Sequence, residues 1–268
     1  MIPHIANFYW NRETPLSYLR LLTLRTFRHH HPDWKMRLWT SESNMVNVWS
    51  GNLEQQDFQT GGIKDYITQV SYLGIETVVF NEPITKQLAP TFISDIVRFR
   101  SIDGGGWFFD LDQIFCRSFD DLCDCDFILG GYKDVMYCGV VGASHSSNAP
   151  AIICERQKGL IANRLTLYNG LGILLLRSVL QSHDFAILTS GEKHRMLPHQ
   201  YFYPVPESAR VEQIYNGVLQ IPASPDNYAV HWYGGHPLSQ EFNRKYTPEF
   251  AKTSNDSISF YCRKIEIL

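Results

Sequence analysis

The feature that most constrains this chain is the block of residues 94–119, SDIVRFRSIDGGGWFFDLDQIFCRSF. Its first part predicts a helix capped by Ser94, with Asp95 in the first turn, where unpaired backbone N–H groups favour a negative charge. Asp95 and Arg98 are three residues apart and therefore share one face of this helix. The glycines of residues 104–106 then end the helix and allow a tight turn.

The second part of the block, residues 107–115, is aromatic and apolar with few polar interruptions, and it predicts a buried strand. Asp110 and Asp112 are two residues apart, so on a strand their carboxylates point to the same side. Burying two carboxylates without a partner is costly, and a divalent cation such as Mg²⁺ or Mn²⁺ compensates their charge. The alternative is that one aspartate caps a turn while the other pairs with Arg98 or Arg117.

The whole block resembles the central signature of glycosyltransferases of the GT-A type that carry an Asp-x-Asp motif. The resemblance is to the group of mannosyltransferase-like and capsular-polysaccharide-like sugar transferases, which are distantly similar to the large clostridial glucosylating toxins. It is strong over this block and looser elsewhere. The positions that match the signature are Ser94, Asp95, Arg98, Gly104, Gly105, Asp110 and Asp112.

This resemblance implies a single GT-A domain over residues 1–268, with a Rossmann-like mixed sheet flanked by helices. A loop-rich insertion is expected around residues 41–63, which are polar and marked by glycine. The length of 268 residues is sufficient for one large α/β domain.

The resemblance also assigns roles to individual residues. The implied catalytic residues are Asp95, Arg98, Asp110 and Asp112. The implied metal ligands are Asp110, Asp112 and His231, which ends a strand pattern before a Gly-Gly turn. The implied substrate-binding residues are Phe8, Tyr9, Trp10, Asp95, Arg98, Gly105, Asn169 and Trp232. Ser144 and His145 are further candidates for facing the donor sugar.

The aromatic residues that end the N-terminal run MIPHIANFYW are placed by resemblance at the base and ribose of a nucleotide. An aromatic side chain stacked on a base contributes about 1–3 kcal/mol. For Phe8 and Tyr9 the alternative is a role as core aromatics of the strand. Trp10 is the preferred stacking residue.

Patterns elsewhere predict an alternation of strands and helices. The expected strands are residues 1–10, 35–39, 75–80, 126–131, 136–142 and 185–189. The expected helices are residues 15–30, 63–72, 150–162 and 171–180. The three consecutive histidines at residues 29–31 are interpreted as structural or solvent-facing.

Charge and cysteine content exclude some classes. A net charge of −3 and a pI of about 6.4 leave no general basic field for a nucleic-acid backbone. The six cysteines form no C-x-x-C pair, which favours reduced thiols in a cytoplasmic protein. No apolar run long enough for a transmembrane segment or signal peptide is present.

The sequence therefore predicts a metal-dependent glycosyltransferase, a hexosyltransferase, that uses Mn²⁺ or Mg²⁺ and a UDP- or GDP-sugar donor. Retention of anomeric configuration is expected by resemblance. The acceptor is left open among a glycan, a lipid-linked glycan, a protein and a modified nucleotide. A haloacid dehalogenase-like phosphatase is one alternative, although Ile114 stands where that family has Thr or Val. A catalytically silent sugar-binding protein is another.

Overall fold

The computed structural model describes residues 1–41, 62–131, 137–163, 170–205 and 210–268. Asn169 and nearly all of the expected insertion at residues 41–63 lie outside this part of the chain. Within it, a seven-stranded mixed sheet forms the centre of an α/β fold, which confirms the predicted fold class. In sheet order the strands are β3 (Glu76–Val79), β2 (Lys35–Ser41), β1 (Ile5–Asn11), β4 (Gly106–Phe109), β7 (Val140–Ala143), β6 (Phe127–Gly130) and β8 (His194–Leu197).

The direction of the strands changes in the middle of the sheet. β1 runs parallel to both β2 and β4, whereas β7 is antiparallel to its neighbours β4 and β6. β4 is the central strand and all of its residues are buried, as its aromatic sequence predicts. A separate two-stranded sheet pairs β5 (Gln113–Phe115) with β9 (Ala229–His231). The chain therefore passes directly from the main sheet at β4 into the small sheet at β5.

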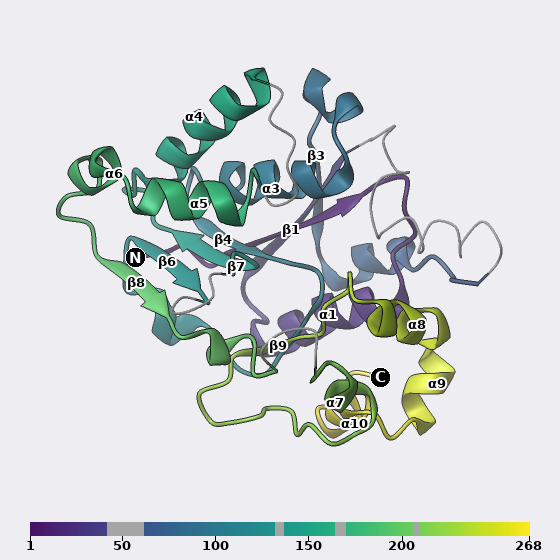
Figure 1. Ribbon diagram of the computed structural model, residues 1–268. Coiled ribbons are helices and arrows are strands. Elements are labelled where there is room, and N and C mark those ends of the chain that lie inside the picture. Colours follow the sequence, from purple (N-terminus) through teal and green to yellow (C-terminus); the bar gives the residue numbers. More distant parts are fainter. Residues whose placement is uncertain (42–61, 132–136, 164–169, 206–209) are drawn as a thin grey trace.

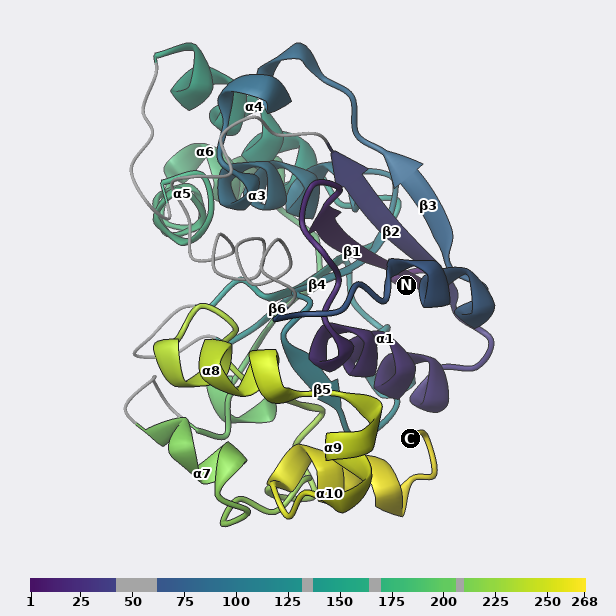
Figure 2. The same ribbon diagram turned by 90° about the vertical axis from the view of Figure 1, so that its right-hand side faces the viewer.

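Helices cover both faces of the main sheet, as Figures 1 and 2 show. One face carries α3 (Pro90–Arg100), α4 (Ala149–Ala162), α5 (Ile173–Leu180) and α6 (His183–Leu188). The other faces α1 (Tyr18–His30), the small sheet and the C-terminal helices. These are α7 (Glu212–Tyr215), α8 (Pro237–Lys245), α9 (Pro248–Thr253) and α10 (Ser257–Lys264). Each face has its own buried apolar cluster, so the molecule has three layers.

The side chains of β1 alternate between these two clusters. Phe8 packs on the α1 side with Phe27, Phe109 and Phe115, while Tyr9 packs on the α3 side. This alternation follows from the two-residue repeat of a strand. Both faces of β1 are consequently buried, as expected for a strand in the middle of a parallel region.

The predicted cap of one helix and the predicted type of another element were wrong, and the helix predicted for residues 63–72 is a 3-10 helix at Ile67–Leu73. α3 begins after Ala89 with Pro90 in its first turn, so Ser94 lies inside the helix and does not cap it. Proline suits the first helical turn because it has no N–H to leave unpaired. Residues 185–189 were predicted as a strand and instead belong largely to α6, because the Ser182 side chain accepts a hydrogen bond from the N–H of Phe185 and caps a helix.

The continuous strand predicted for residues 107–115 is also interrupted. β4 ends at Phe109 and β5 starts at Gln113, so Asp110 and Asp112 lie in the connection between the two sheets. The N–H of Asp110 still donates to the carbonyl of Gly139 at 2.9 Å, whereas the carbonyl of Asp112 accepts from the N–H of Trp232 at 2.8 Å. The segment changes hydrogen-bonding partners here, and both carboxylates project from it.

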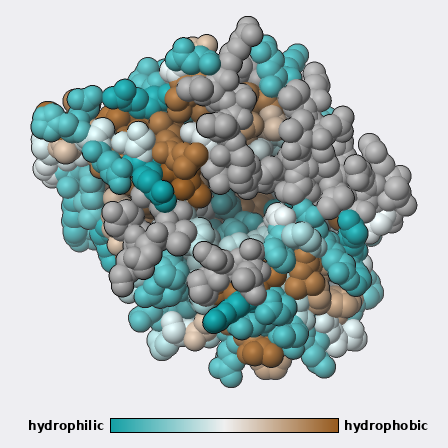
Figure 3. All heavy atoms as spheres, in the orientation of Figure 1, coloured by the Kyte–Doolittle hydropathy of each residue, from teal (hydrophilic) through white to brown (hydrophobic). Residues whose placement is uncertain are grey.

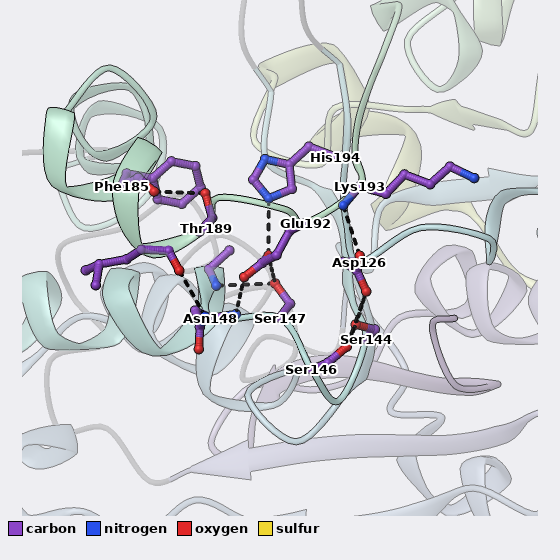
Figure 4. A network of polar contacts seen from close by, with 12 residues as sticks. Asp126, Ser144, Ser146, Ser147, Asn148, Phe185, Thr189, Glu192, Lys193 and His194 are labelled. Carbon is purple, nitrogen blue, oxygen red and sulfur yellow. Dashed lines mark hydrogen bonds and ion pairs between the residues drawn. The ribbon is translucent and has the colours of Figure 1, made fainter.

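The end of β7 that lies away from Asp110 is held by a network of polar contacts (Figure 4). The Ser144 hydroxyl donates to Oδ1 of Asp126 at 2.9 Å, and the N–H of Lys193 donates to Oδ2 of Asp126 at 2.9 Å. The register pairs Gly106 with Ala143, so Ser144 lies at the start of β4 and not at the end that carries Asp110. The suggested position of Ser144 beside a donor sugar is therefore wrong.

Among the described helices, none has both the length and the apolar character that crossing a bilayer requires.

Candidate metal and donor site

The site is built where β4 ends and β9 ends, at the junction of the two sheets. Gln113 pairs with His231 in the register of β5 and β9, which brings His231 next to the segment that carries the two aspartates. One potential ligand atom each from Asp110, Asp112 and His231 lies within 4.8 Å of the others. Figure 3 shows the surface hollowed and largely hydrophilic between α5 and α8.

Asp112 is held by several donors. Its Oδ2 accepts from the N–H of Gly234 at 2.8 Å, and its Oδ1 lies 3.0 Å from Nε2 of His231. Burial raises the pKa of this carboxyl, but His231, Arg20 and the Gly234 N–H outweigh that effect and lower it to about 2. Asp112 is therefore ionised at neutral pH.

His231 has defined hydrogen bonds at both ring nitrogens. Nδ1 accepts from the N–H of Tyr233 at 3.1 Å, so the neutral ring carries its proton on Nε2 and donates it to Asp112. Tyr233 has a positive φ of 53°, and its ring packs edge-on against the imidazole. The turn after β9 thus fixes the orientation of the histidine.

Asp110 faces Arg98 across the end of the sheet. Nη2 of Arg98 donates to Oδ1 of Asp110 at 2.9 Å, and Nη1 donates to Oδ1 of Asp95 on the same helix. The shared helical face predicted for Asp95 and Arg98 is confirmed, and the two side chains pair there, although in the middle of α3 and not in its first turn. Arg98 therefore links the helix to the segment after β4, and its pairing with Asp110 is the contact that the alternative interpretation of the two aspartates predicted.

Arg98 and Asp95 are both almost completely shielded from solvent. Burial alone would lower the pKa of Arg98, but the nearby acidic groups, among them Asp110 and Asp95, hold it well above its ordinary value. Burial raises the pKa of Asp95, and Arg98 opposes this effect. The guanidinium is thus a permanent positive charge beside the aspartates.

Two glycines leave room for these carboxylates. A Cβ at Gly139 would stand 2.5 Å from Oδ2 of Asp110 and 2.6 Å from the hydroxyl of Tyr203. A Cβ at Gly172, just before α5, would stand 2.5 Å from Oδ1 of Asp95. Neither contact is sterically tolerable, so both positions require glycine for this arrangement.

Trp10 is the partly exposed member of the N-terminal aromatic residues. Its Nε1 donates to the carbonyl of Thr14 at 2.8 Å, and the guanidinium of Arg20 lies 4.2 Å from its ring centroid. Arg20 also lies 5.2 Å from the ring centroid of Trp232. Trp10 therefore stays a candidate for contact with a nucleotide.

The structure does not support substrate contact at three other predicted positions. Phe8 and Trp232 are 0% exposed, and Tyr9 is buried with its hydroxyl 2.8 Å from that of Ser41. Phe8 and Trp232 belong to the core cluster that includes α1, so a ligand could reach them only by opening the core. The alternative interpretation of Phe8 and Tyr9 as core aromatics fits their positions.

Gly105 lies at the other end of β4 from Asp110. Its φ is 86°, and a Cβ there would meet Pro3 and His145 at 3.0 and 2.9 Å. This glycine therefore serves the turn into β4, and the structure does not bring it to the aspartates. Asn169 is outside the described residues.

Sequence reasoning missed Arg20 and Gly139, and it noted Gly234 only as part of the turn after His231. Arg20 is only 9% exposed, and it contributes to the low pKa of Asp112. A buried arginine in the first turn of an apolar helix is an unusual choice and is the signal that could have identified it. Gly139 and Gly234 matter because side chains from distant parts of the chain come very close to them at the junction of the two sheets. No local sequence pattern indicates such contacts.

The donor set matches a hard divalent cation by type. Carboxylate oxygens suit Mg²⁺ and Mn²⁺, and an imidazole adds preference for Mn²⁺. The carboxylates of Asp110 and Asp112 fit directly. His231 can bind a metal through Nε2 only as the other neutral tautomer, in which the ring proton has moved to Nδ1 and the N–H of Tyr233 no longer donates to that nitrogen. In the described part of the chain, this is the one group of three or more His, Cys or acidic side chains with that spacing.

No family model matches this sequence, and no curated protein matches it. Solved structures show weak likenesses. The glycosyltransferase GlyE of Streptococcus pneumoniae TIGR4 aligns over 100% of this chain with 12% identity and a TM-score of 0.47, and this chain spans 64% of the GlyE chain.

Two further solved glycosyltransferases align at a similar level. The PaToxG glycosyltransferase covers 68% of this chain and 70% of its own with 12% identity and a TM-score of 0.48. The galactosyltransferase LgtC covers 92% of this chain and 98% of its own with 11% identity and a TM-score of 0.41. Likenesses at this level carry no argument about this chain, whose own side chains have to support any function.

Proposed function

We propose that this protein is a metal-dependent glycosyltransferase of the GT-A type that transfers a hexose from a UDP- or GDP-sugar to an acceptor with retention of anomeric configuration. The observation that carries the proposal is the meeting of Asp110, Asp112 and His231 beside the buried Arg98. The sequence block that resembles the glycosyltransferase signature supplies three of these four residues.

In this proposal Asp110 and Asp112 hold Mn²⁺ or Mg²⁺, with Nε2 of His231 as a third ligand. When bound, the ion supplies Lewis-acid stabilisation of the negative charge that develops on a departing nucleotide diphosphate. The two carboxylates are positioned for this by different partners. Arg98 fixes Asp110, and the Gly234 N–H fixes Asp112.

The chain's own groups then have distinct tasks. Arg98 supplies a preorganised positive charge in a site of low dielectric, where such a charge stabilises a transition state strongly. By the resemblance, Asp95 is assigned to the donor sugar hydroxyls, with the 13% of its side chain that stays exposed beside Arg98, and the ring of Trp10 is assigned to stacking on the base. Asp95 is held beside Arg98, while Trp10 is in contact with Arg20.

The phosphatase alternative is not favoured. It needs an aspartate that is free to act as a nucleophile, whereas Asp110 is paired with Arg98 and Asp112 accepts from both Gly234 and His231. The second alternative, a catalytically silent sugar-binding protein, shares the same site and differs only in the absence of turnover.

One experiment separates these functions. The protein is incubated with UDP- and GDP-sugars in the presence of Mn²⁺, Mg²⁺ or EDTA, and the released nucleotide diphosphate is measured. Release with metal, greater with Mn²⁺ than with Mg²⁺ and lost with EDTA, is the expected result. Binding of a nucleotide sugar without release would support the silent protein. Metal-dependent hydrolysis of p-nitrophenyl phosphate with no action on sugar donors would support the phosphatase.

A further inference from the structure

Helix α1 presents a row of buried polar residues to the segment that follows β4. The hydroxyl of Thr23 donates to the carbonyl of Leu111 at 3.2 Å, and Nη1 of Arg20 approaches the same oxygen at 3.5 Å. Further along, Oγ1 of Thr26 accepts from the N–H of Phe115 at 3.1 Å. The row follows the three-residue spacing of one helical face, so α1 lies alongside the 111–115 segment.

The carbonyl of Leu111 stands between the two candidate metal ligands, Asp110 and Asp112. The segment has left the main sheet at this point, and it joins the small sheet only at Gln113. The two donors from α1 therefore take the place of a strand partner for this carbonyl. The Leu111 carbonyl belongs to the planar peptide that leads into Asp112, and the Leu111 Cα joins that peptide to the one that follows Asp110, so holding this carbonyl restrains the backbone between the two aspartates.

Arg20 makes a second connection to the site. Its guanidinium lies near the rings of both Trp10 and Trp232, at 4.2 and 5.2 Å from their centroids. Its Nη2 is 2.9 Å from the place where a Cβ of Gly234 would stand, and the N–H of Gly234 donates to Asp112. A planar guanidinium can stack on an aromatic face in a way that the ammonium of lysine cannot.

We propose that Arg20 and Thr23 are positioning residues that set the geometry of the metal-binding carboxylates by holding the Leu111 carbonyl from α1. This inference rests on the proposed metal site. It adds α1 to the parts of the chain that shape this site. The two contacts from α1 to Leu111 span 91 and 88 residues of sequence.

The test uses Mn²⁺ alone and substitutions that conserve charge, so that a change in affinity reports geometry and not electrostatics. Free Mn²⁺ is titrated by electron paramagnetic resonance with wild type, Thr23→Val, Thr23→Ser and Arg20→Lys. Loss of an outer-shell contact weakens metal binding by about 10- to 100-fold, so the dissociation constants of Thr23→Val and Arg20→Lys are expected to rise by about tenfold or more. Thr23→Ser keeps the hydroxyl and should bind nearly as wild type.

Arg25→Lys on the same helix is the matched control. Arg25 donates to the Tyr18 hydroxyl, the Ile267 carbonyl and the Gln69 side chain, away from the aspartates. The Arg25→Lys substitution should lower the melting temperature. Its Mn²⁺ dissociation constant should stay within about twofold of wild type, well below the change expected when an outer-shell contact is lost.

The outcomes separate the two proposals. Wild type that binds no Mn²⁺ overturns the proposed metal site. Wild type that binds Mn²⁺, with Thr23→Val and Arg20→Lys folded and binding equally well, overturns the positioning role alone. The role is also overturned if Arg25→Lys weakens Mn²⁺ binding as much as they do, since the effect would then be one of general stability.

Discussion

Nη2 of Arg98 donates to Oδ1 of Asp110 at 2.9 Å and thereby joins the middle of α3 to the segment after the central strand. The same guanidinium pairs with Asp95 through its other terminal nitrogen. One buried cation thus satisfies two acidic side chains on two different elements. The arrangement depends strongly on Arg98, because removing this arginine would leave two acidic side chains without a counter-charge.

Arg98→Met is expected to lower the free energy of unfolding by about 3–5 kcal/mol, since it leaves Asp95 and Asp110 without their counter-charge. Urea denaturation measures the change. Arg156→Met is the control, because Arg156 and its partner Asp184 are 56% and 66% exposed, and such surface pairs contribute about 0–1 kcal/mol. The double variant Asp95→Asn/Arg98→Met should recover part of the loss. Equal effects of the two arginine substitutions would contradict the central role of Arg98.

Asp112→Asn is expected to reduce metal-dependent release of nucleotide diphosphate by at least about 100-fold, because a charged ligand at the position of developing charge is lost. The fold should persist, since the amide oxygen can still accept from Gly234. Circular dichroism and a Mn²⁺ titration accompany the activity assay. Asp103→Asn is the control, because Asp103 is an exposed acid near the other end of β4. Full turnover by Asp112→Asn would contradict the proposal that Asp112 holds a catalytic metal ion.

Gly139→Ala is expected to weaken Mn²⁺ binding by about tenfold or more, because the new methyl group meets the Asp110 carboxylate and the Tyr203 hydroxyl. Gly159→Ala makes the same chemical change inside α4, where no atom lies within 4 Å of the added Cβ. That control should bind Mn²⁺ as wild type and gain about 0.5–1 kcal/mol of stability, since alanine favours a helix over glycine. Metal titration and thermal melting compare the two. Unchanged affinity in Gly139→Ala would show that Asp110 can move freely or does not bind metal.

Stability is expected to fall as the pH decreases from about 6.5 to about 4, in part through His31. Burial lowers the pKa of His31 to about 4, and the ring is neutral with both nitrogens engaged, Nδ1 with the Phe27 carbonyl and Nε2 with the N–H of Phe119. The unfolded state binds a proton near pH 6.5 and the folded state only near pH 4, so acid favours unfolding.

The size of this effect is up to about 3 kcal/mol for one histidine over that pH range. Denaturant midpoints at pH 7.5, 5.5 and 4.5 measure it. His31→Gln should be less stable at pH 7.5 but show a shallower decline, whereas His29→Gln, on an exposed side chain, should follow wild type. A decline of the same steepness in His31→Gln would show that other groups cause it.

Part of the site could be predicted from the sequence because it depends on local spacing. The contact between Asp95 and Arg98 follows from their positions three residues apart on a helix, and the glycine turn into β4 follows from the backbone freedom of glycine. The two aspartates were expected on one face of a strand. They do lie close together, but in a connection between two sheets, so the expected proximity was correct and the predicted reason was wrong.

Other errors arose where burial and long-range packing override a local pattern. Phe8 and Trp232 look like available aromatic residues in the sequence, yet both are enclosed by the core. The helix that contains Asp95 starts earlier than its serine suggested, because Pro90 offers a better first turn. Local preferences are weak, so tertiary contacts decide such boundaries.

By itself the sequence determined the α/β class, the central aromatic strand and the acidic and arginine side chains available at its end, because these depend on periodicity and on spacings of a few residues. Only the tertiary structure decided that His231 and the Gly234 N–H reach Asp112 and that Arg20 and Thr23 reach Leu111. Those contacts span about ninety residues or more and exist because β9 pairs with β5 and α1 packs against it. Hydrophobic burial drives that packing and is non-directional, so no local pattern in the chain specifies which distant segments it brings together.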